Sequence, residues 1–376
     1  MTASRRQQIC LIAVFLALIG IVAPSQMVSE LREGEPAQIV ELFRQPPTRA
    51  NLRRLETNLE NRCRLAQMVR PWTQYARFVL FEDAGDKALV GPSGWFFYRP
   101  AVQYSIEPWS PGAADAQGDI VNAIISFRDQ LAKRGIKLLI MPAPNKASIY
   151  PEMLAARTAG LSAPVNPTTR DVLAKLKGAG VEIVDLFEVF GAARRESDTA
   201  YYLAQDSHWS PEGIRLAAAV VARKLFDAGW VAKGPVQYEM KPVTIERYGD
   251  VLRMMRTPQV ERRFQPQRMN CTQVVNAETG KPYVDDPNSP VLVLGDSFLR
   301  IFERDEPGSG GFIAHLAYHL GFGLTSLVND GGASTLVRQQ LARKPALLQG
   351  KKVVVWEFVE RDIRFGTEGW QVIPLP

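Results

Sequence analysis

The stretch Val291-Leu-Val-Leu-Gly-Asp-Ser-Phe-Leu-Arg300 decides the fold. Its first four residues are apolar and include two valines, which is typical of a strand buried on both faces of a parallel sheet. Gly295 permits a tight turn, and Asp296 and Ser297 are good N-caps for a helix that begins near Phe298. Ser297 is therefore predicted at the carboxyl end of a buried strand, where open α/β sheets bind ligands. There the hydroxyl has the layout of a nucleophile beside an oxyanion site. The alternative is a serine that only caps its helix.

A base for that serine is found in Asp206-Ser-His-Trp-Ser-Pro-Glu-Gly213, which contains one of only three histidines in the chain. A serine is a weak nucleophile until an imidazole, oriented by a carboxylate, takes its proton. Asp206 and His208 are two residues apart, so an extended segment places both side chains on the same face. Ser210 and Pro211 then predict the start of a helix over 211–227. The alternative is that His208 is a structural histidine at that helix start.

From residue 118 onward the chain alternates between predicted helices and strands. Helical patterns cover 118–135, 168–176, 211–227 and 334–343, and short apolar runs typical of strands cover 137–141, 181–187, 291–294 and 352–359. Repeated β-α units of this size indicate right-handed crossovers onto a mainly parallel sheet. The predicted fold class is therefore α/β.

These blocks resemble the SGNH-hydrolase-like domain of the bacterial alginate O-acetylation proteins, the AlgX/AlgJ family. The resemblance covers the chain from about Gly91 to its end. It rests on Gly-Asp-Ser after a buried strand, on Asp-x-His-Trp upstream of it, on Pro144-Asn-Lys146 with Tyr150-Pro-Glu152, and on residues 91–98. Ordinary SGNH hydrolases carry an Asp-x-x-His pair after the serine. Here the pair precedes the serine, which is the arrangement of the acetylation family.

The resemblance implies an SGNH-hydrolase-like three-layer sandwich around the parallel sheet. It also implies that Ser297, His208 and Asp206 are nucleophile, base and orienting acid, with no cofactor. In SGNH-like enzymes an Asn in a loop after a strand helps to bind the oxyanion, which makes Asn329 the candidate donor. At that block Leu327 stands where the family has glycine.

Two basic residues are further candidates for contacts with the oxyanion or the substrate. Lys146 follows a predicted strand at its carboxyl end, on the ligand side of a parallel sheet. It could pair with a sugar carboxylate, hold an active-site loop, or be solvated. Arg300 closes the stretch that contains the serine.

The amino terminus is predicted to be a membrane anchor. Arg5 and Arg6 precede an apolar run over residues 9–23, which is shorter than the roughly 20 residues of a comfortable span. Proline directly after Ala23 makes a poor cleavage site, so an uncleaved anchor is favoured and a cleaved signal peptide is the alternative. The arginines predict that their end of the chain stays cytoplasmic and that everything after about Gln26 lies outside the inner membrane, in the periplasm. The expected division is an anchor over 1–25, a spacer and helical region over 26–85, and a catalytic domain over 86–376.

Within that domain, residues 231–290 break the alternation and are predicted to be an insertion of loops and short strands. The arginines there could attract a polyanion, since their forks match carboxylates, or they could be scattered on a solvated surface. They are Arg247, Arg253, Arg256, Arg262, Arg263 and Arg268.

The cysteines and the remaining histidines bear on compartment and metal binding. Cys10 falls in the apolar run, so Cys63 and Cys271 are a candidate disulfide in an oxidising compartment, or two buried thiols in a reducing one. His315 and His319 are four residues apart, as a metal pair would need, but no carboxylate cluster completes a site and no metal is predicted. The formal net charge of +6 is too small to indicate nucleic acid.

The family implies acyl transfer through a serine ester, namely O-acetylation of an exopolysaccharide such as alginate, with an anionic polymer expected. The expected partners are a multi-spanning membrane acyltransferase that supplies acetyl groups and other proteins of the export complex. The same three residues with water as acceptor make a carbohydrate acetylesterase, and the sequence leaves the two open. A third possibility is a polysaccharide-binding member of the complex that performs no chemistry.

Overall fold

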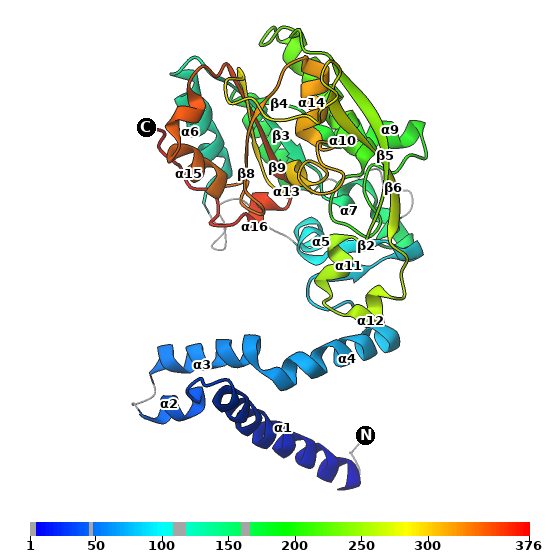
Figure 1. Ribbon diagram of the computed structural model, residues 1–376, viewed down its shortest axis with the longest axis vertical. Coiled ribbons are helices and arrows are strands. Elements are labelled where there is room, and N and C mark those ends of the chain that lie inside the picture. The colour runs from blue at the N-terminus through cyan, green and yellow to red at the C-terminus, as the bar shows by residue number, and fades with distance from the viewer. Residues whose placement is uncertain (1–4, 45–47, 108–117, 159–165) are drawn as a thin grey trace. The chain divides into compact units, whose positions relative to one another are not determined.

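The computed structural model describes residues 5–44, 48–107, 118–158 and 166–376 (Figure 1). The chain forms two compact units. The first comprises Met1–Asp83 with Arg256–Arg262, and the second comprises Ala84–Met255 with Arg263–Pro376. The second unit contains the sheet and all of the candidate catalytic residues.

The first unit is helical. Its helices are α1 (Arg5–Arg32), α2 (Gln38–Arg44), α3 (Arg49–Arg62), α4 (Arg64–Phe81) and, from the insertion, α12 (Pro258–Glu261). Within α1, the segment Gln8–Arg32 is long and apolar enough to cross a membrane. Where the sequence predicts a polar spacer, α1 continues past Pro24 and α2 follows. The polar residues are accommodated because Gln26 donates to Glu30 one turn on (3.0 Å) and accepts from the backbone N–H of Arg64 (3.3 Å).

The second unit is built on a five-stranded sheet in the order β4-β3-β9-β7-β8. Its strands are β3 (Lys137–Ala143), β4 (Glu182–Ile183), β7 (Val291–Gly295), β8 (Thr325–Val328) and β9 (Val353–Val359), and every pairing is parallel. Before the sheet come the antiparallel pair β1 (Ala88–Val90) and β2 (Phe96–Tyr98) and then α5 (Arg99–Ile106). Because the strands are parallel, the segments that follow β3, β7, β8 and β9 all leave from the same edge.

Helices cover both faces of this sheet (Figure 1). One face packs against α9 (Leu186–Glu196), α10 (Pro211–Asp227) and α14 (Phe312–Leu320), and the other against α6 (Ile120–Ala132), α8 (Pro167–Gly178) and α15 (Leu336–Ala342). Successive residues of β3 alternate between the two cores, with Leu139 and Met141 on the first side and Leu138 and Ile140 on the second. The predicted α/β fold with three layers and a parallel sheet is confirmed.

One predicted strand is much shorter than expected. The sequence predicts a strand over 181–187, but β4 has only two residues and α9 begins at Leu186. The difference arises at Asp185, whose side chain accepts a hydrogen bond from the backbone N–H of Glu188 (3.4 Å) and thereby caps the helix.

The insertion contains two long strands rather than short ones. β5 (Tyr238–Arg247) and β6 (Gln267–Asn276) pair antiparallel along their full length, and α11 (Asp250–Met254) and α12 lie between them in the chain. The remaining short helices are α7 (Lys146–Ile149), α13 (Ser297–Arg300) and α16 (Asp362–Phe365), which follow β3, β7 and β9 at the same edge of the sheet.

The predicted bridge between Cys63 and Cys271 is not formed, because both thiols are free. Each is enclosed in its own unit: Cys63 is buried where α3 meets α4, and Cys271 lies on β6 in the core of the second unit. Burial raises the pKa of the Cys271 thiol to about 12, so this sulfur is a poor nucleophile for disulfide exchange.

Candidate active site

Ser297 lies at the carboxyl end of β7, an interior strand that pairs with β9 on one side and β8 on the other. All five residues of β7 are buried, and α13 begins at the serine itself. Gly295 is required for space, since a Cβ there would lie 2.5 Å from both the Glu357 carboxylate and Leu299. Asp296 caps α13 by accepting the backbone N–H of Phe298 (2.9 Å), so capping is done by Asp296 and the Ser297 hydroxyl is left for other partners.

A tight hairpin presents Asp206 and His208. Tyr202 and Trp209 form an antiparallel bridge, and the backbone N–H of Leu203 donates to the carbonyl of His208 (3.2 Å). Ser210 then caps α10 by accepting the N–H of Gly213 (3.1 Å), as the sequence predicts. The hairpin and the helix together hold the turn that carries the acid and the imidazole.

The three side chains form one hydrogen-bonded chain. Nδ1 of His208 lies 2.6 Å from Oδ1 of Asp206, and Nε2 of His208 lies 2.9 Å from Oγ of Ser297. Asp206 and His208 are buried and Ser297 is half-buried. With Nδ1 as the N–H donor to the carboxylate, Nε2 is an acceptor aimed at the hydroxyl proton. This arrangement can deprotonate the serine.

The charges around the imidazole favour its protonated form. Burial alone would lower the pKa of His208, but Asp206, through its charge and its hydrogen bond, together with Asp250 and Asp296, raises that pKa above the ordinary value. For Asp206, burial opposes ionisation, yet His208 and Arg247 bring the pKa of this carboxyl well below its ordinary range. Asp206 therefore stays ionised, and its charge would stabilise an imidazolium at His208.

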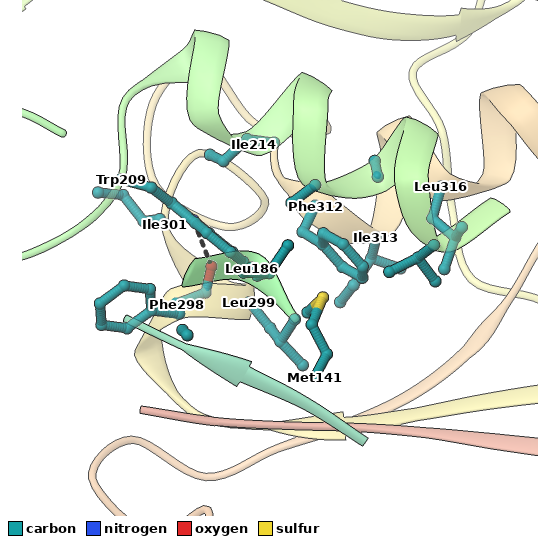
Figure 2. Packing of buried hydrophobic residues seen from close by; sticks show 14 of the residues in the cluster. Met141, Leu186, Trp209, Ile214, Phe298, Leu299, Ile301, Phe312, Ile313 and Leu316 are labelled. Carbon is teal, nitrogen blue, oxygen red and sulfur yellow. Dashed lines mark hydrogen bonds between the residues drawn. The ribbon is translucent and has the colours of Figure 1, made fainter. Parts of the chain in front are cut away.

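An aromatic contact fixes the hairpin to the nucleophile's helix (Figure 2). Trp209 is fully buried and its Nε1 donates to the carbonyl of Phe298 (3.0 Å). Its ring meets that of Phe298 at a centroid distance of 5.3 Å and stacks on Phe312 at 5.8 Å. Since Trp209 follows His208 and Phe298 follows Ser297, this packing holds the His208 imidazole next to the Ser297 hydroxyl.

A second acid, which sequence reasoning missed, lies beside the pair. Asp250 begins α11 in the insertion, and its Oδ2 is 3.5 Å from Nδ1 of His208. It accepts from both the backbone N–H and the hydroxyl of Ser207 (2.6 Å each), and its own N–H donates to Oδ2 of Asp206 (3.0 Å). Gly249 allows this approach, because a Cβ there would lie 2.1 Å from the carbonyl oxygen of Gln205. No short-range pattern links residues 206 and 250, so only the fold could reveal the contact.

Lys146 is buried beneath the hairpin. Its Nζ donates to the carbonyls of Phe96 (2.6 Å), Ala204 (2.7 Å) and Asp206 (3.0 Å), and it lies 4.8 Å from the centroid of the Trp95 ring. Burial lowers the pKa of this lysine to about 7, against the opposing effect of nearby carboxylates. The side chain thus contacts the backbone of the active-site loop, not solvent.

Asn329 and Arg300 lie on the other side of the serine. Asn329 follows β8 directly, is half-buried, and donates its backbone N–H to the carbonyl of Gly295 (3.0 Å). Arg300 ends α13 and forms ion pairs with Asp305 (2.5 Å) and with Asp330 (2.8 Å). Arg300 therefore ties the serine's helix to the loop that carries Asn329.

The remaining histidines lie on α14 and take no part in this chain. Nε2 of the buried His315 lies 3.2 Å from Oγ1 of Thr272, and burial lowers the pKa of His315 to about 4. Ligand atoms of Asp206, His208 and Asp250 lie within 4.8 Å of one another, close enough for a metal ion. In the structure, however, Nδ1 and the carboxylate oxygens are engaged in the hydrogen bonds described above.

Comparison with known proteins gives a consistent result. The family model described as an SGNH hydrolase-like domain, acetyltransferase AlgX, matches residues 88–360. The probable alginate O-acetylase AlgJ of Pseudomonas aeruginosa is 29% identical over 150 residues, which are 39% of this chain and 34% of that relative. The protein of the same description from Azotobacter vinelandii is 23% identical over 295 residues, or 76% of this chain and 71% of the relative.

Two solved structures share the fold. The O-acetyltransferase domain of Pseudomonas putida AlgJ has a TM-score of 0.58 at 21% identity, over 74% of this chain and 92% of that domain. Pseudomonas aeruginosa AlgX has a TM-score of 0.54 at 19% identity, over 72% of this chain and 62% of that protein.

Proposed function

The chain belongs to the AlgX family of SGNH hydrolase-like acetyltransferase domains, and from this we propose that it is an O-acetyltransferase that moves acetyl groups through a serine ester onto hydroxyls of an exopolysaccharide such as alginate. The observation that carries the proposal is the hydrogen-bonded chain from Asp206 through His208 to Ser297, at the ligand-binding edge of a parallel sheet. The names of the curated relatives agree with this substrate class.

The first half-reaction forms the acetyl-enzyme. Oγ of Ser297 attacks the donor's acetyl carbonyl while its proton passes to Nε2 of His208, and Asp206 stabilises the resulting imidazolium. The negative charge on the carbonyl oxygen is held by the backbone N–H of Ser297 and by the side-chain amide of Asn329. When the tetrahedral species collapses, the C–O bond to the donor breaks and the leaving alkoxide takes the proton from Nε2.

The second half-reaction runs the same steps with a sugar hydroxyl. Its oxygen attacks the acetyl-serine carbonyl, its proton goes to Nε2 of His208, and the Ser297 oxygen regains that proton as it leaves. If water took the place of the sugar, the product would be acetate and the protein an esterase. The choice depends on whether the site orients a sugar and excludes water.

Localisation and partners follow from the same proposal. With α1 as an anchor and arginines before its apolar run, the catalytic unit would face the periplasm at the inner membrane. A multi-spanning acyltransferase would pass acetyl groups outward to Ser297, beside other proteins of the export complex. A reporter enzyme that works only in the periplasm should be active when it is fused to the carboxyl terminus. Activity of a reporter that works only in the cytoplasm would contradict this topology.

The proposal is tested by chemistry at Ser297. A fluorophosphonate probe should label the wild type and not Ser297→Ala. Hydrolysis of an acetyl-ester reporter should fall by several orders of magnitude in Ser297→Ala and in His208→Ala, because nucleophile and base act as a unit. His319→Ala, on the half-buried end of α14, is the matched control and should change little. If the probe labels the wild type, turnover is measured on untreated protein with the acetyl-ester reporter as donor. Acetylation of added oligosaccharide would indicate a transferase, and release of acetate alone an esterase. If the probe does not label the wild type, a binding protein would be indicated.

A further inference from the structure

Arg247, the last residue of β5, has a guanidinium with unused hydrogen-bond donors at the triad. Its nearest acidic oxygens are Oδ2 of Asp206 at 3.5 Å and Oδ2 of Asp305 at 3.6 Å. Both distances exceed the roughly 2.7–2.9 Å of a charge-assisted hydrogen bond. Among the residues that the structure describes, no hydrogen bond from this guanidinium is formed, and the side chain is 21% exposed. Its fork is therefore available to a ligand.

Contacts other than hydrogen bonds hold this side chain in place. The guanidinium lies over the ring of the buried Phe302, 5.8 Å from its centroid, between the two carboxylates. A planar fork that is already oriented loses little entropy when a two-oxygen ligand binds to it. Carboxylates have the matching geometry.

A second arginine shares one of these acids. Arg300, three residues after Ser297, pairs through Nη1 with Oδ1 of Asp305 at 2.5 Å. The Asp305 carboxylate thus bridges two guanidinium groups that come from β5 and α13. Arg300 is 30% exposed, and its Nε also pairs with Oδ2 of Asp330 at 2.8 Å. It lines a hollow of about 200 Å³ whose other charged residues are Arg304, Asp285 and Glu303.

We propose that Arg247 and Arg300 together bind a carboxylate of the polymer beside the acetylated hydroxyl, and that the Asp305 carboxylate occupies this position in the free protein. The inference rests on the proposed function and assigns two residues of this chain to a carboxylate of its substrate. Asp305 is suited to exchange because it is 28% exposed and lies in the loop between α13 and α14. Asp206 remains in place, since it is fully buried and hydrogen-bonded to His208.

The test measures binding separately from chemistry. Full-length protein in detergent is titrated calorimetrically with a non-acetylated oligouronate and with the same oligosaccharide after reduction of its carboxylates to hydroxymethyl groups. Arg247→Gln and Arg300→Gln should each weaken oligouronate binding about 10-fold or more, the loss expected for a charge-assisted hydrogen bond, without a matching change for the reduced sugar. Arg268→Gln, an exposed arginine of β6, is the control and should bind both as the wild type does.

Asp305→Asn separates recognition from mere structural support. If Asp305 competes with the ligand, its loss should tighten oligouronate binding severalfold. If the ion pairs only stabilise the loop, the same change should weaken binding, and that result would overturn the inference. Arg247→Lys keeps the charge but loses the fork and should retain part of the affinity, which guards against misfolding of the glutamine variant.

Failure of this inference is distinguishable from failure of the proposed function. Equal affinity of the wild type for the charged and reduced oligosaccharides would refute the carboxylate site, even if the acetyl-ester reporter is hydrolysed. Selective oligouronate binding by a protein with no reporter activity would support the site and refute the acyl transfer.

Discussion

Replacing Lys146 by methionine tests how the active-site loop is held. Nζ of Lys146 is a hydrogen-bond donor to three backbone carbonyls, those of Phe96, Ala204 and Asp206, and the side chain is only 4% exposed. Methionine keeps the length of the aliphatic chain but loses the ammonium group that lies over the Trp95 ring. It removes every donor, so the carbonyls lose a buried partner.

The magnitude can be worked from these contacts. The carbonyl of Ala204 keeps a second donor, the backbone N–H of Phe96 at 2.7 Å, so the loss falls on the carbonyls of Phe96 and Asp206. A buried acceptor left without a partner costs about 1–3 kcal/mol. Part of this is offset because the variant no longer buries an ammonium group. We expect a net destabilisation of about 2–4 kcal/mol, which lowers Tm by roughly 5–15 °C in a domain of this size.

Activity should suffer as well, since the Asp206 carbonyl belongs to the residue that orients His208. Loss of that anchor should lower kcat for the acetyl-ester reporter by about 10- to 100-fold at temperatures where the variant is folded, because a small misplacement of the base is costly. Calorimetric melting and steady-state kinetics measure the two effects, with the exposed Lys137→Met as control. A Tm within a degree of wild type together with an unchanged kcat would refute the reasoning.

Three more outcomes are expected. Asp206→Asn should lower kcat of the reporter reaction by roughly 10⁴-fold, because it favours the wrong tautomer of His208. Asp250→Asn should lower kcat far less, because the Asp250 carboxylate is 3.5 Å from Nδ1 of His208 and the Asp206 carboxylate is 2.6 Å from it. Equal losses in the two variants would contradict these roles. Asp206 and its neighbours raise the pKa of His208 against the effect of burial, and the base must be neutral to act. The value of kcat/KM should therefore fall with decreasing pH, with an inflection above the ordinary pKa of histidine. This inflection should move to lower pH in Asp250→Asn, and an inflection below the ordinary pKa in the wild type would exclude the arrangement. Alkylation of the native, non-reduced protein should leave Cys63 and Cys271 unmodified, and unfolding should make both react; mass spectrometry that detects a bridged pair instead would contradict the free thiols of the structure.

Local sequence was sufficient for much of the frame. The apolar run before Gly295 predicted a strand buried on both faces, because such a strand leaves no polar face. Ser210 and Pro211 predicted the start of α10 from capping chemistry alone. The spacing of Asp206 and His208 predicted a shared face, and in the structure the two side chains are hydrogen-bonded. Each of these predictions depends only on neighbours within a few residues.

Local signals failed where two segments compete or where polar residues find distant partners. The strand predicted over 181–187 is cut short because the Asp185 side chain stabilises a helix start more than the apolar run stabilises a longer strand. The spacer predicted after the anchor is helical because Gln26 is satisfied by Glu30 and by the backbone of α4. The two cysteines of the candidate disulfide are free thiols in the structure, and each is buried in its own unit.

What the sequence by itself determined is which residues are the candidates for the reacting groups: a serine after a buried strand, and an acid and a histidine on one extended turn. Only the tertiary structure decided what surrounds them. It brings Asp250 to the imidazole, three carbonyls to Lys146, and Arg247 and Arg300 to one carboxylate. Except for the pair Arg300–Asp305, which is local, these contacts join residues 40 or more positions apart. No local propensity encodes them, since they exist only once the sheet and its insertion have packed.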